Sequence, residues 1–237
     1  MSASWGSDHW ERVASETRWG SYIDVVEHRA VDLGSRLAAP SSTALDFGCG
    51  SGRWSEQLDA QGWHMSCVDV DTTVLATCRE RVPGAECSMI DPDATTLPAP
   101  TASIRLLLCL EVFEVVHEQW FVDEVARVVE PGGVIVVTVS NATSYRRVPF
   151  WLRTRLAGSR RSDRVYSAMY SVPYRSWRQR LRSHGFNFVF EEGICWAPFS
   201  RESNSVLIPA ATALERIVGL RRLPVVSPWV VAVAQRR

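Results

Sequence analysis

Two uninterrupted apolar segments constrain the fold of this chain more than any other feature. Residues 104–110 (IRLLLCL) contain one charged residue, Arg105, and residues 134–140 (VIVVTVS) contain none. A strand with one solvated face would alternate apolar and polar residues, so these segments predict strands that are covered on both faces. Such strands belong to parallel sheets with helices on either side. The chain is therefore predicted to be an α/β protein.

The other segments alternate between strand-like and helix-like patterns. Strands are predicted over 43–47, 64–70, 86–90, 104–110, 134–140, 186–192 and 229–234, with helices over 8–38, 53–60, 73–82, 117–129, 174–184 and 206–218. The length of 237 residues fits one domain. We divide it into an N-terminal helical arm (1–40), a core (41–141), a basic aromatic cap (142–185) and a sheet extension (186–237). A parallel sheet of this kind binds ligands beyond the carboxyl ends of its strands.

The net charge of zero hides a strong asymmetry. Residues 1–144 contain 9 Arg and 21 acidic residues, whereas residues 145–237 contain 17 Arg and 5 acidic residues. Interleaved Arg and aromatic residues fill 145–182, and three interpretations of this segment stay open. It is a solvated lid paired with the acidic half, a cap that selects a flat or apolar substrate, or a surface for anionic lipid or nucleic acid. Nucleic acid is disfavoured because the chain contains no recognisable RNA-binding module.

The chain contains neither a signal-peptide pattern at its N-terminus nor an apolar run of about 18 residues, so we expect a cytoplasmic protein. Its six cysteines are Cys49, Cys67, Cys78, Cys87, Cys109 and Cys195. None forms a CxxC pair or stands near a His at zinc spacing. The spacing therefore predicts small, buried, reduced cysteines and no metal site.

A glycine turn follows the first predicted strand. In LDFGCGSGRW, Asp46 stands at the strand end, and Gly48, Gly50 and Gly52 precede the helix. Because glycine has no Cβ, a ligand can approach the backbone closely there. Dinucleotide-binding folds prefer GxGxxG, which cups a pyrophosphate. The GxGxG spacing with a preceding carboxylate better suits a ligand that carries an ammonium group.

Carboxylates also end the second and third predicted strands. Asp69 follows the first glycine by about 20 residues, where a carboxylate can accept both hydroxyls of a ribose. Asp91 and Asp93 follow the third strand and could accept a hydrogen bond from an adenine amino group. One acid at a strand end is more often a turn former. Acids after three successive strands indicate a nucleoside ligand.

This constellation resembles the class I S-adenosylmethionine-dependent methyltransferases, specifically the type 11 group that is similar to ubiquinone and menaquinone biosynthesis enzymes. The matching pieces are LDFGCGSG, CVDVD, DATTLP, LCLEVFEV and RVVEPGGVIVVTVSN, from about Thr43 to Val139. The resemblance implies a doubly wound, seven-stranded, Rossmann-like sheet whose last strand is antiparallel. It also implies S-adenosylmethionine as the cofactor and a small molecule as the methyl acceptor.

The same resemblance implies roles for individual residues. It assigns Asp46, Gly48, Cys49 and Gly50 to the methionine moiety and Asp69 to the ribose. It assigns Asp93, or else Asp91, to the adenine, and Leu110 and Glu111 to the border of the sulfonium. Val70 and Ala94 are further cofactor-binding residues. Arg18 would pair with the cofactor carboxylate, or it is a solvated residue of an amphipathic helix.

Two departures from the residues that are usual in this family stand out. Arg105 replaces an acid that such proteins carry, which concerns packing, and Glu114 replaces a frequent His, which concerns the acceptor site.

Methyl transfer from a sulfonium depends mainly on aligning the acceptor and excluding water. A base is needed only for a poorly ionised hydroxyl or a protonated amine. The candidates are Glu111, Glu114, His117 and Tyr145; we take Glu114 and His117 as the catalytic pair, although His117 can equally be an exposed residue at a helix start.

We expect O-methylation ahead of N- or C-methylation. An NAD(P)-dependent oxidoreductase and a non-catalytic protein that binds the cofactor or its demethylated product are the alternatives. Peripheral contact with an anionic membrane and the oligomeric state stay open.

Overall fold

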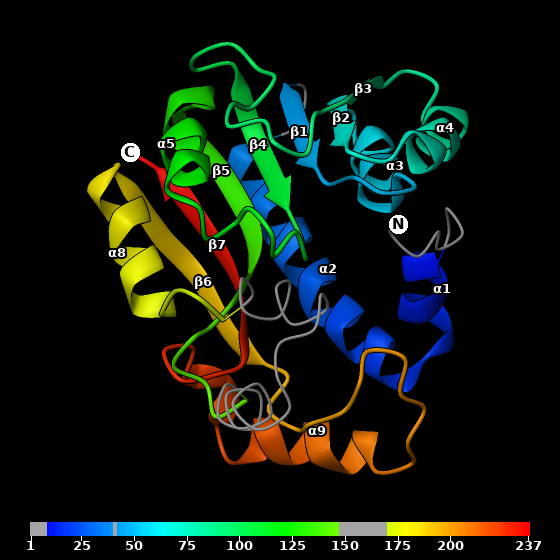
Figure 1. The fold of residues 1–237 in the computed structure, drawn as a ribbon, viewed down its shortest axis with the longest axis vertical. Helices are drawn as coiled ribbons and strands as arrows, with labels where there is room; N and C mark the ends of the chain where they lie inside the picture. Colours follow the sequence, from blue (N-terminus) through cyan, green and yellow to red (C-terminus); the bar gives the residue numbers. More distant parts are fainter. Residues whose placement is uncertain (1–8, 40–41, 147–169) are drawn as a thin grey trace.

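The computed structural model describes residues 9–39, 42–146 and 170–237, in which seven strands form one sheet (Figure 1). The strand order is β3-β2-β1-β4-β5-β7-β6. The strands are β1 (Thr43–Phe47), β2 (His64–Asp69), β3 (Glu86–Met89), β4 (Ile104–Cys109), β5 (Val129–Ser140), β6 (Phe186–Ile194) and β7 (Trp229–Arg236). Strands β1 to β5 pair in parallel, and β7 is antiparallel to both β5 and β6. The predicted seven-stranded, mostly parallel sheet is confirmed.

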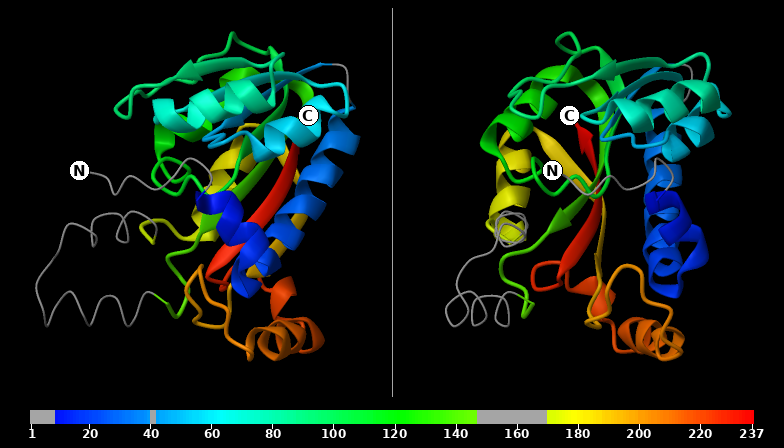
Figure 2. Two further views of the ribbon diagram at one scale, coloured as in Figure 1. Left: turned by 90° about the vertical axis from the view of Figure 1, so that its right-hand side faces the viewer. Right: turned by 45° about the vertical axis from the view of Figure 1, so that its right-hand side comes forward.

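Helices cover both faces of this sheet (Figure 2). One face packs against α2 (Arg18–Ala38), α3 (Arg53–Asp59) and α4 (Thr72–Arg81), and the other against α5 (Gln119–Val128) and α8 (Tyr174–Ser183). Along β4, Leu106 and Leu108 belong to the first core, while Leu107 and Cys109 belong to the second. Successive residues of a strand point to opposite faces, which explains why this strand is apolar throughout. The helices α1 (His9–Glu16) and α9 (Ile208–Ile217) and the 3-10 helix η1 (Leu220–Arg222) complete the described elements.

The predicted helix over 8–38 is two helices. Thr17 has extended backbone angles, and its hydroxyl accepts a hydrogen bond from the Gly20 amide at 3.0 Å. A Thr that accepts this bond caps a helix N-terminus, so α2 starts anew after α1 ends. The break allows α1 to turn away from the sheet while α2 runs along it.

Strand β5 starts at Val129, five residues earlier than predicted, and includes Pro131-Gly132-Gly133. The Arg105 side chain stabilises the start of β5 through three contacts. Its guanidinium donates to the carbonyl oxygens of Ala38 at 2.7 Å and Pro131 at 3.2 Å and pairs with Glu130 at 3.2 Å. Arg105 thus fills a packing role near the amino end of β4, at the sheet edge opposite the glycine turn.

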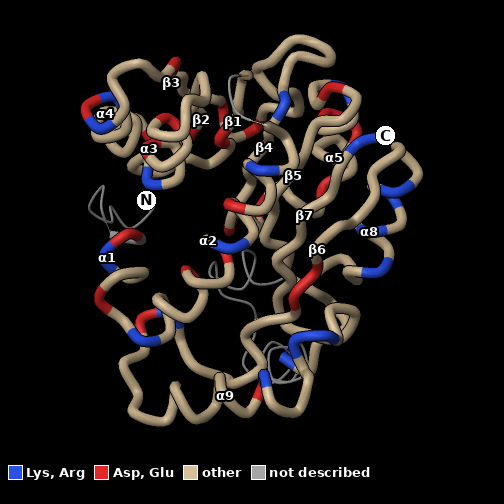
Figure 3. Tube along the Cα trace, turned by 180° about the vertical axis from the view of Figure 1, so that it is seen from behind, with Lys and Arg blue, Asp and Glu red and all other residues tan. Residues whose placement is uncertain are grey.

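Much of the predicted basic cap, residues 147–169, lies outside the described residues. The end of that segment forms α8, which packs on one face of the sheet, while the cap as a whole stays a prediction. Tyr174 and Trp177 are fully buried in the core beneath α8, and the Trp177 indole donates to the Val116 carbonyl at 2.8 Å. Arginines recur along α8 (Figure 3), and the half-buried Arg178 pairs with Glu191 of β6 at 2.7 Å.

None of the helices in the described ranges combines the length and apolar character that crossing a membrane requires.

Candidate functional site

The glycine turn joins β1 to α3 at the carboxyl edge of the sheet. The amides of Gly48 and Cys49 both donate to the Val68 carbonyl of β2, at 2.7 and 3.1 Å. Gly50 has a φ of +54°, and a Cβ built on it would have no neighbour within 4 Å. Its backbone is therefore open on one side, as the close approach of a ligand requires.

Asp69, at the end of β2, faces this turn. One carboxylate oxygen accepts the Gly50 amide at 2.9 Å, and the other accepts the Asp71 amide at 3.0 Å. These bonds fix the orientation of the side chain and use only part of its capacity, since a carboxylate offers about four lone-pair sites. Val70, which follows it, is 53% exposed. The structure thus brings Asp69 and the glycine turn together, as the sequence predicts.

The acids after β3 form a turn of their own. The Asp91 side chain accepts the Asp93 amide at 2.8 Å, and the Asp91 carbonyl accepts the Ala94 amide at 2.9 Å. Both carboxylates are exposed, while Ala94 is half-buried. Asp91 therefore builds the loop that carries Asp93.

Asp46 lies beneath the turn and is only 2% exposed. Its carboxylate accepts the Ser55 hydroxyl of α3 at 2.7 Å. Burial raises the pKa of Asp46 to about 7, and the nearby Cys67 adds to the rise. This carboxyl group is thus poised to change its charge near neutral pH.

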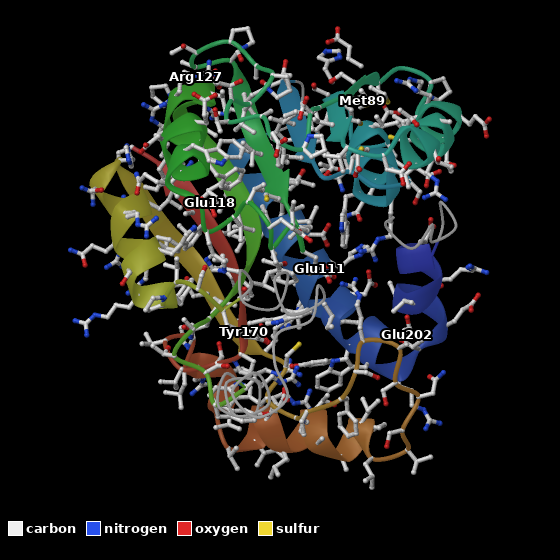
Figure 4. All side chains as sticks on the ribbon, in the orientation of Figure 1. Met89, Glu111, Glu118, Arg127, Tyr170 and Glu202 are labelled. Atoms are coloured by element: carbon white, nitrogen blue, oxygen red, sulfur yellow. The ribbon has the colours of Figure 1, made fainter. Side chains whose placement is uncertain are left out.

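Leu110 and Glu111 follow β4 at the same edge. Glu111 has a φ of +60°, which is unusual for a residue with a side chain, and it lies between the end of β4 and α2 (Figure 4). Its carboxylate forms an ion pair with Arg201, which comes from the loop after β6. Burial lowers the pKa of Arg201 to about 10. Nothing in the local sequence around Arg201 predicts this partner.

A second group of charges that the sequence analysis missed connects α2 to the start of α3. Arg53, the residue after the last glycine, pairs with Asp24 and lies 3.8 Å from Glu27. Glu27 is buried and accepts the Thr138 hydroxyl at 2.7 Å. Burial raises the pKa of Glu27, although the bond from Thr138 works against the rise. The i, i+3 spacing of Asp24 and Glu27 in the sequence could have indicated this group of charges, but the same spacing also fits an ordinary solvated helix face.

The predicted catalytic residues lie in different environments. Glu114 is exposed. His117 is only 4% exposed, so its interpretation as an exposed residue at a helix start is wrong. Its Nε2 lies 2.8 Å from the Ser140 hydroxyl at the end of β5. Tyr145 is partly exposed, and its hydroxyl donates to the Trp196 carbonyl.

Arg18 is exposed at the start of α2 and is held by the loop before α9. Its amide donates to the Asn204 side chain at 2.9 Å, and its guanidinium donates to the Asn204 carbonyl at 3.1 Å. These hydrogen bonds hold the backbone and the guanidinium of Arg18 at the amino end of α2. They favour its interpretation as a residue of an amphipathic helix over a cofactor ligand.

Comparisons with known proteins point to one family. Residues 45–137 match the family model described as a methyltransferase domain. A probable S-adenosylmethionine-dependent methyltransferase of Mycobacterium tuberculosis is 32% identical over 111 residues, which cover 45% of this chain and 40% of that protein. A ubiquinone biosynthesis O-methyltransferase of Xylella fastidiosa is 29% identical over 120 residues, or 47% of each chain. The chain thus spans less than half the length of these two curated relatives.

The fold agrees with this match. The crystal structure of geranyl diphosphate C-methyltransferase from Streptomyces coelicolor aligns with a TM-score of 0.59 over 100% of this chain and 86% of that one. The sequence identity is 13%, so this likeness shows the fold alone. Residues 45–137, which include the glycine turn and the carboxylates that surround it, thus match a methyltransferase domain in sequence, and the sheet has the fold of this structural neighbour.

Proposed function

We propose that this protein transfers the methyl group of S-adenosylmethionine to a small molecule, with O-methylation ahead of N- or C-methylation. The observation that carries the proposal is the contact between Asp69 and the Gly50 amide. This contact joins a carboxylate suited to a ribose to a turn whose backbone is open to a ligand. The match of residues 45–137 to the methyltransferase domain supports the same conclusion.

The residues present fit this cofactor. In the proposed arrangement Asp69 accepts the ribose hydroxyls, Asp93 accepts the adenine amino group, and Leu110 and Glu111 border the sulfur. The buried Asp46 would balance the ammonium group of the methionine moiety, since a cation favours the ionised form of a carboxyl group. When bound, S-adenosylmethionine supplies a methyl group on a cationic sulfur that leaves as a neutral thioether. The protein then has to position the acceptor and exclude water.

Glu114 and His117 stay the proposed catalytic residues for an acceptor that must lose a proton. Glu114 is accessible to an acceptor, and His117 is oriented by its contact with Ser140. Glu111 is a weaker candidate because its carboxylate is already paired with Arg201. The ubiquinone-pathway relative is named as an O-methyltransferase, which supports the preference for oxygen.

The test is calorimetric titration of the protein with S-adenosylmethionine. Asp69→Asn is expected to weaken binding at least tenfold, because it removes the charge from hydrogen bonds to the ribose, each worth about 1.5–3 kcal/mol. Asp59→Asn, at the exposed end of α3, is the matched control and should bind as the wild type does. Equal affinity of Asp69→Asn and wild type would show that the ribose assignment is wrong.

The same titration separates the alternatives. Binding of NAD(P) in place of S-adenosylmethionine would support the oxidoreductase. Tight binding of S-adenosylmethionine without turnover of any hydroxylated, amino or activated-carbon acceptor would support the non-catalytic protein.

We also propose peripheral contact with an anionic membrane through α9 and the turn after it. Large apolar side chains are exposed there, with Ile217 at 77% and Val206 at 76%. We call this patch the α9 surface; it comprises Val206, Leu207, Leu214, Ile217, Val218, Leu223, Val225 and Val226. Arg216 and Arg222 are exposed among them. Apolar residues flanked by arginines are typical of surfaces that lie at the boundary of anionic lipid.

A further inference from the structure

Four cysteines that are far apart in the sequence gather behind the glycine turn. The sulfur atoms of Cys67 in β2, Cys78 in α4 and Cys87 in β3 all lie within 4.8 Å of one another. The Cys78 and Cys87 sulfurs are 3.7 Å apart. The Cys49 thiol, in the turn itself, interacts with those of Cys67 and Cys78. All four are free thiols.

The distances fit a metal ion bound by thiolates. With bonds of about 2.3 Å, the sulfur atoms of a tetrahedral zinc site lie about 3.8 Å apart. The separation of Cys78 and Cys87 already matches this value. The other separations among the three sulfurs are within 4.8 Å, so they exceed this value by no more than about 1 Å, which small side-chain movements can close.

The chemistry of the pocket favours the same ligand. It contains several soft sulfur donors, which select thiophilic ions over Mg²⁺ or Ca²⁺. Cys67 and Cys78 are fully buried, while Cys87 on the edge strand β3 is partly exposed and gives a route from solvent.

We propose that Cys67, Cys78 and Cys87, with Cys49 as the fourth ligand, bind one thiophilic divalent ion of the Zn²⁺ class. Binding releases the protons of the ligand thiols to solvent, and no oxidation or reduction takes place. The proposal does not depend on the methyl-transfer function proposed above, although the two sites adjoin at Cys49 in the glycine turn.

The bound ion would stabilise the glycine turn. A Cβ on Gly52 would lie 2.7 Å from the Cys78 sulfur, so the turn packs directly on this cysteine. The Ser55 hydroxyl links Cys67, at 3.2 Å, to Asp46, at 2.7 Å. An ion that holds Cys49 and Cys78 would therefore connect the turn to α4, β2 and β3. Any ligand that binds only the folded state raises its stability.

The test uses the reduced, metal-free, full-length protein and Cd²⁺ as a spectroscopic substitute for Zn²⁺. We expect ultraviolet sulfur-to-metal charge-transfer absorption that saturates at about one equivalent, together with a higher melting temperature. Zn²⁺ should displace the Cd²⁺ signal. Absence of the absorption at one equivalent in the wild-type protein would overturn the proposal without any variant.

Variants then locate the ligands. Cys78→Ser and Cys87→Ser are each expected to weaken Cd²⁺ binding at least tenfold. Cys109→Ser is the matched control, because Cys109 is also buried but belongs to the core on the opposite face of the sheet. Cys87 is partly exposed, so its replacement is the variant that best preserves the fold. An unchanged signal in the Cys78→Ser/Cys87→Ser double variant would place the ion elsewhere and contradict the assignment.

Discussion

At the scale of single residues, burial changes the acid–base chemistry of Asp46, which lies near the end of β1 just before the glycine turn. Its carboxyl group is enclosed beneath the glycine turn and bonded to Ser55. Removal of the charged form from water is the largest cause of its raised pKa, and the single hydrogen bond from Ser55 compensates only in part. The ligand-free protein therefore loses stability when this group ionises.

The pH dependence of unfolding tests this conclusion. A carboxyl group with a pKa near 4 in the unfolded chain and about 7 in the folded chain stabilises the fold at low pH. This contribution is lost as the pH rises through 7. Between pH 5 and pH 8, Asp46→Asn should lose less stability than wild type, by on the order of 2–3 kcal/mol. Parallel curves from denaturant unfolding of the two proteins would show that Asp46 has an ordinary pKa.

At the scale of elements, α1 is attached to the glycine turn by one side chain. The Glu11 carboxylate accepts the Ser51 hydroxyl at 3.2 Å and pairs with Arg81 of α4 at 2.7 Å. Glu11, Asp24, Arg53 and Trp54 line the same cavity of about 200 Å³ between α1, α2 and α3. The short helix thus covers one side of the site through polar contacts.

Removal of this attachment should loosen α1 selectively. Glu11→Ala removes a partly exposed ion pair, which is worth about 1 kcal/mol. Amide hydrogen exchange in α1 is then expected to become about fivefold faster, while exchange in β4 and β5 stays unchanged. Glu16→Ala, an exposed change in the last turn of the same helix, serves as the control. Unchanged protection of α1 in Glu11→Ala would mean that apolar contacts alone hold the helix.

At the scale of the whole molecule, the buried cores on the two sheet faces are distinct from the region where large apolar residues are exposed. The cores on either face are closed by α2, α3 and α4 and by α5 and α8. Most of the exposed large apolar residues in the described ranges belong to the α9 surface, at the end of the molecule away from β3 and α4 (Figure 1). Such concentration distinguishes an interaction surface from scattered exposed residues.

Vesicle binding tests the role of the α9 surface. Vesicles of phosphatidylcholine mixed with phosphatidylglycerol should retain the protein at low salt and release it at high salt, because screening weakens the attraction of the arginines. Leu214→Ser/Ile217→Ser should reduce the retained fraction several-fold. Met89→Ser, at an exposed apolar position on β3 at the other end of the molecule, should not. Equal retention of all three proteins would exclude this surface as the contact.

Features that depend on local patterns could be predicted from the sequence. The approximate positions of the seven strands follow from segments of strand length between turns, most clearly the apolar runs of β4 and β5, and the GxGxG turn follows from glycines between a strand and a helix. The proximity of Asp69 to the turn could also be predicted, since parallel neighbouring strands end at the same edge. The break at Thr17 was missed because the apolar period continues across it while one side-chain bond restarts the helix.

The sequence by itself determined the order of elements, the two-faced burial of β4 and β5 and the carboxylates at the ends of β1 to β3, because these depend on spacings of a few residues. Only the tertiary structure decided which distant side chains meet. Residue spacing excluded a metal site, yet packing of α4 on β2 and β3 brings Cys67, Cys78 and Cys87 within 4.8 Å. The pairing of Glu111 with Arg201 and the burial of His117 likewise depend on loops and helices that close over the sheet edge.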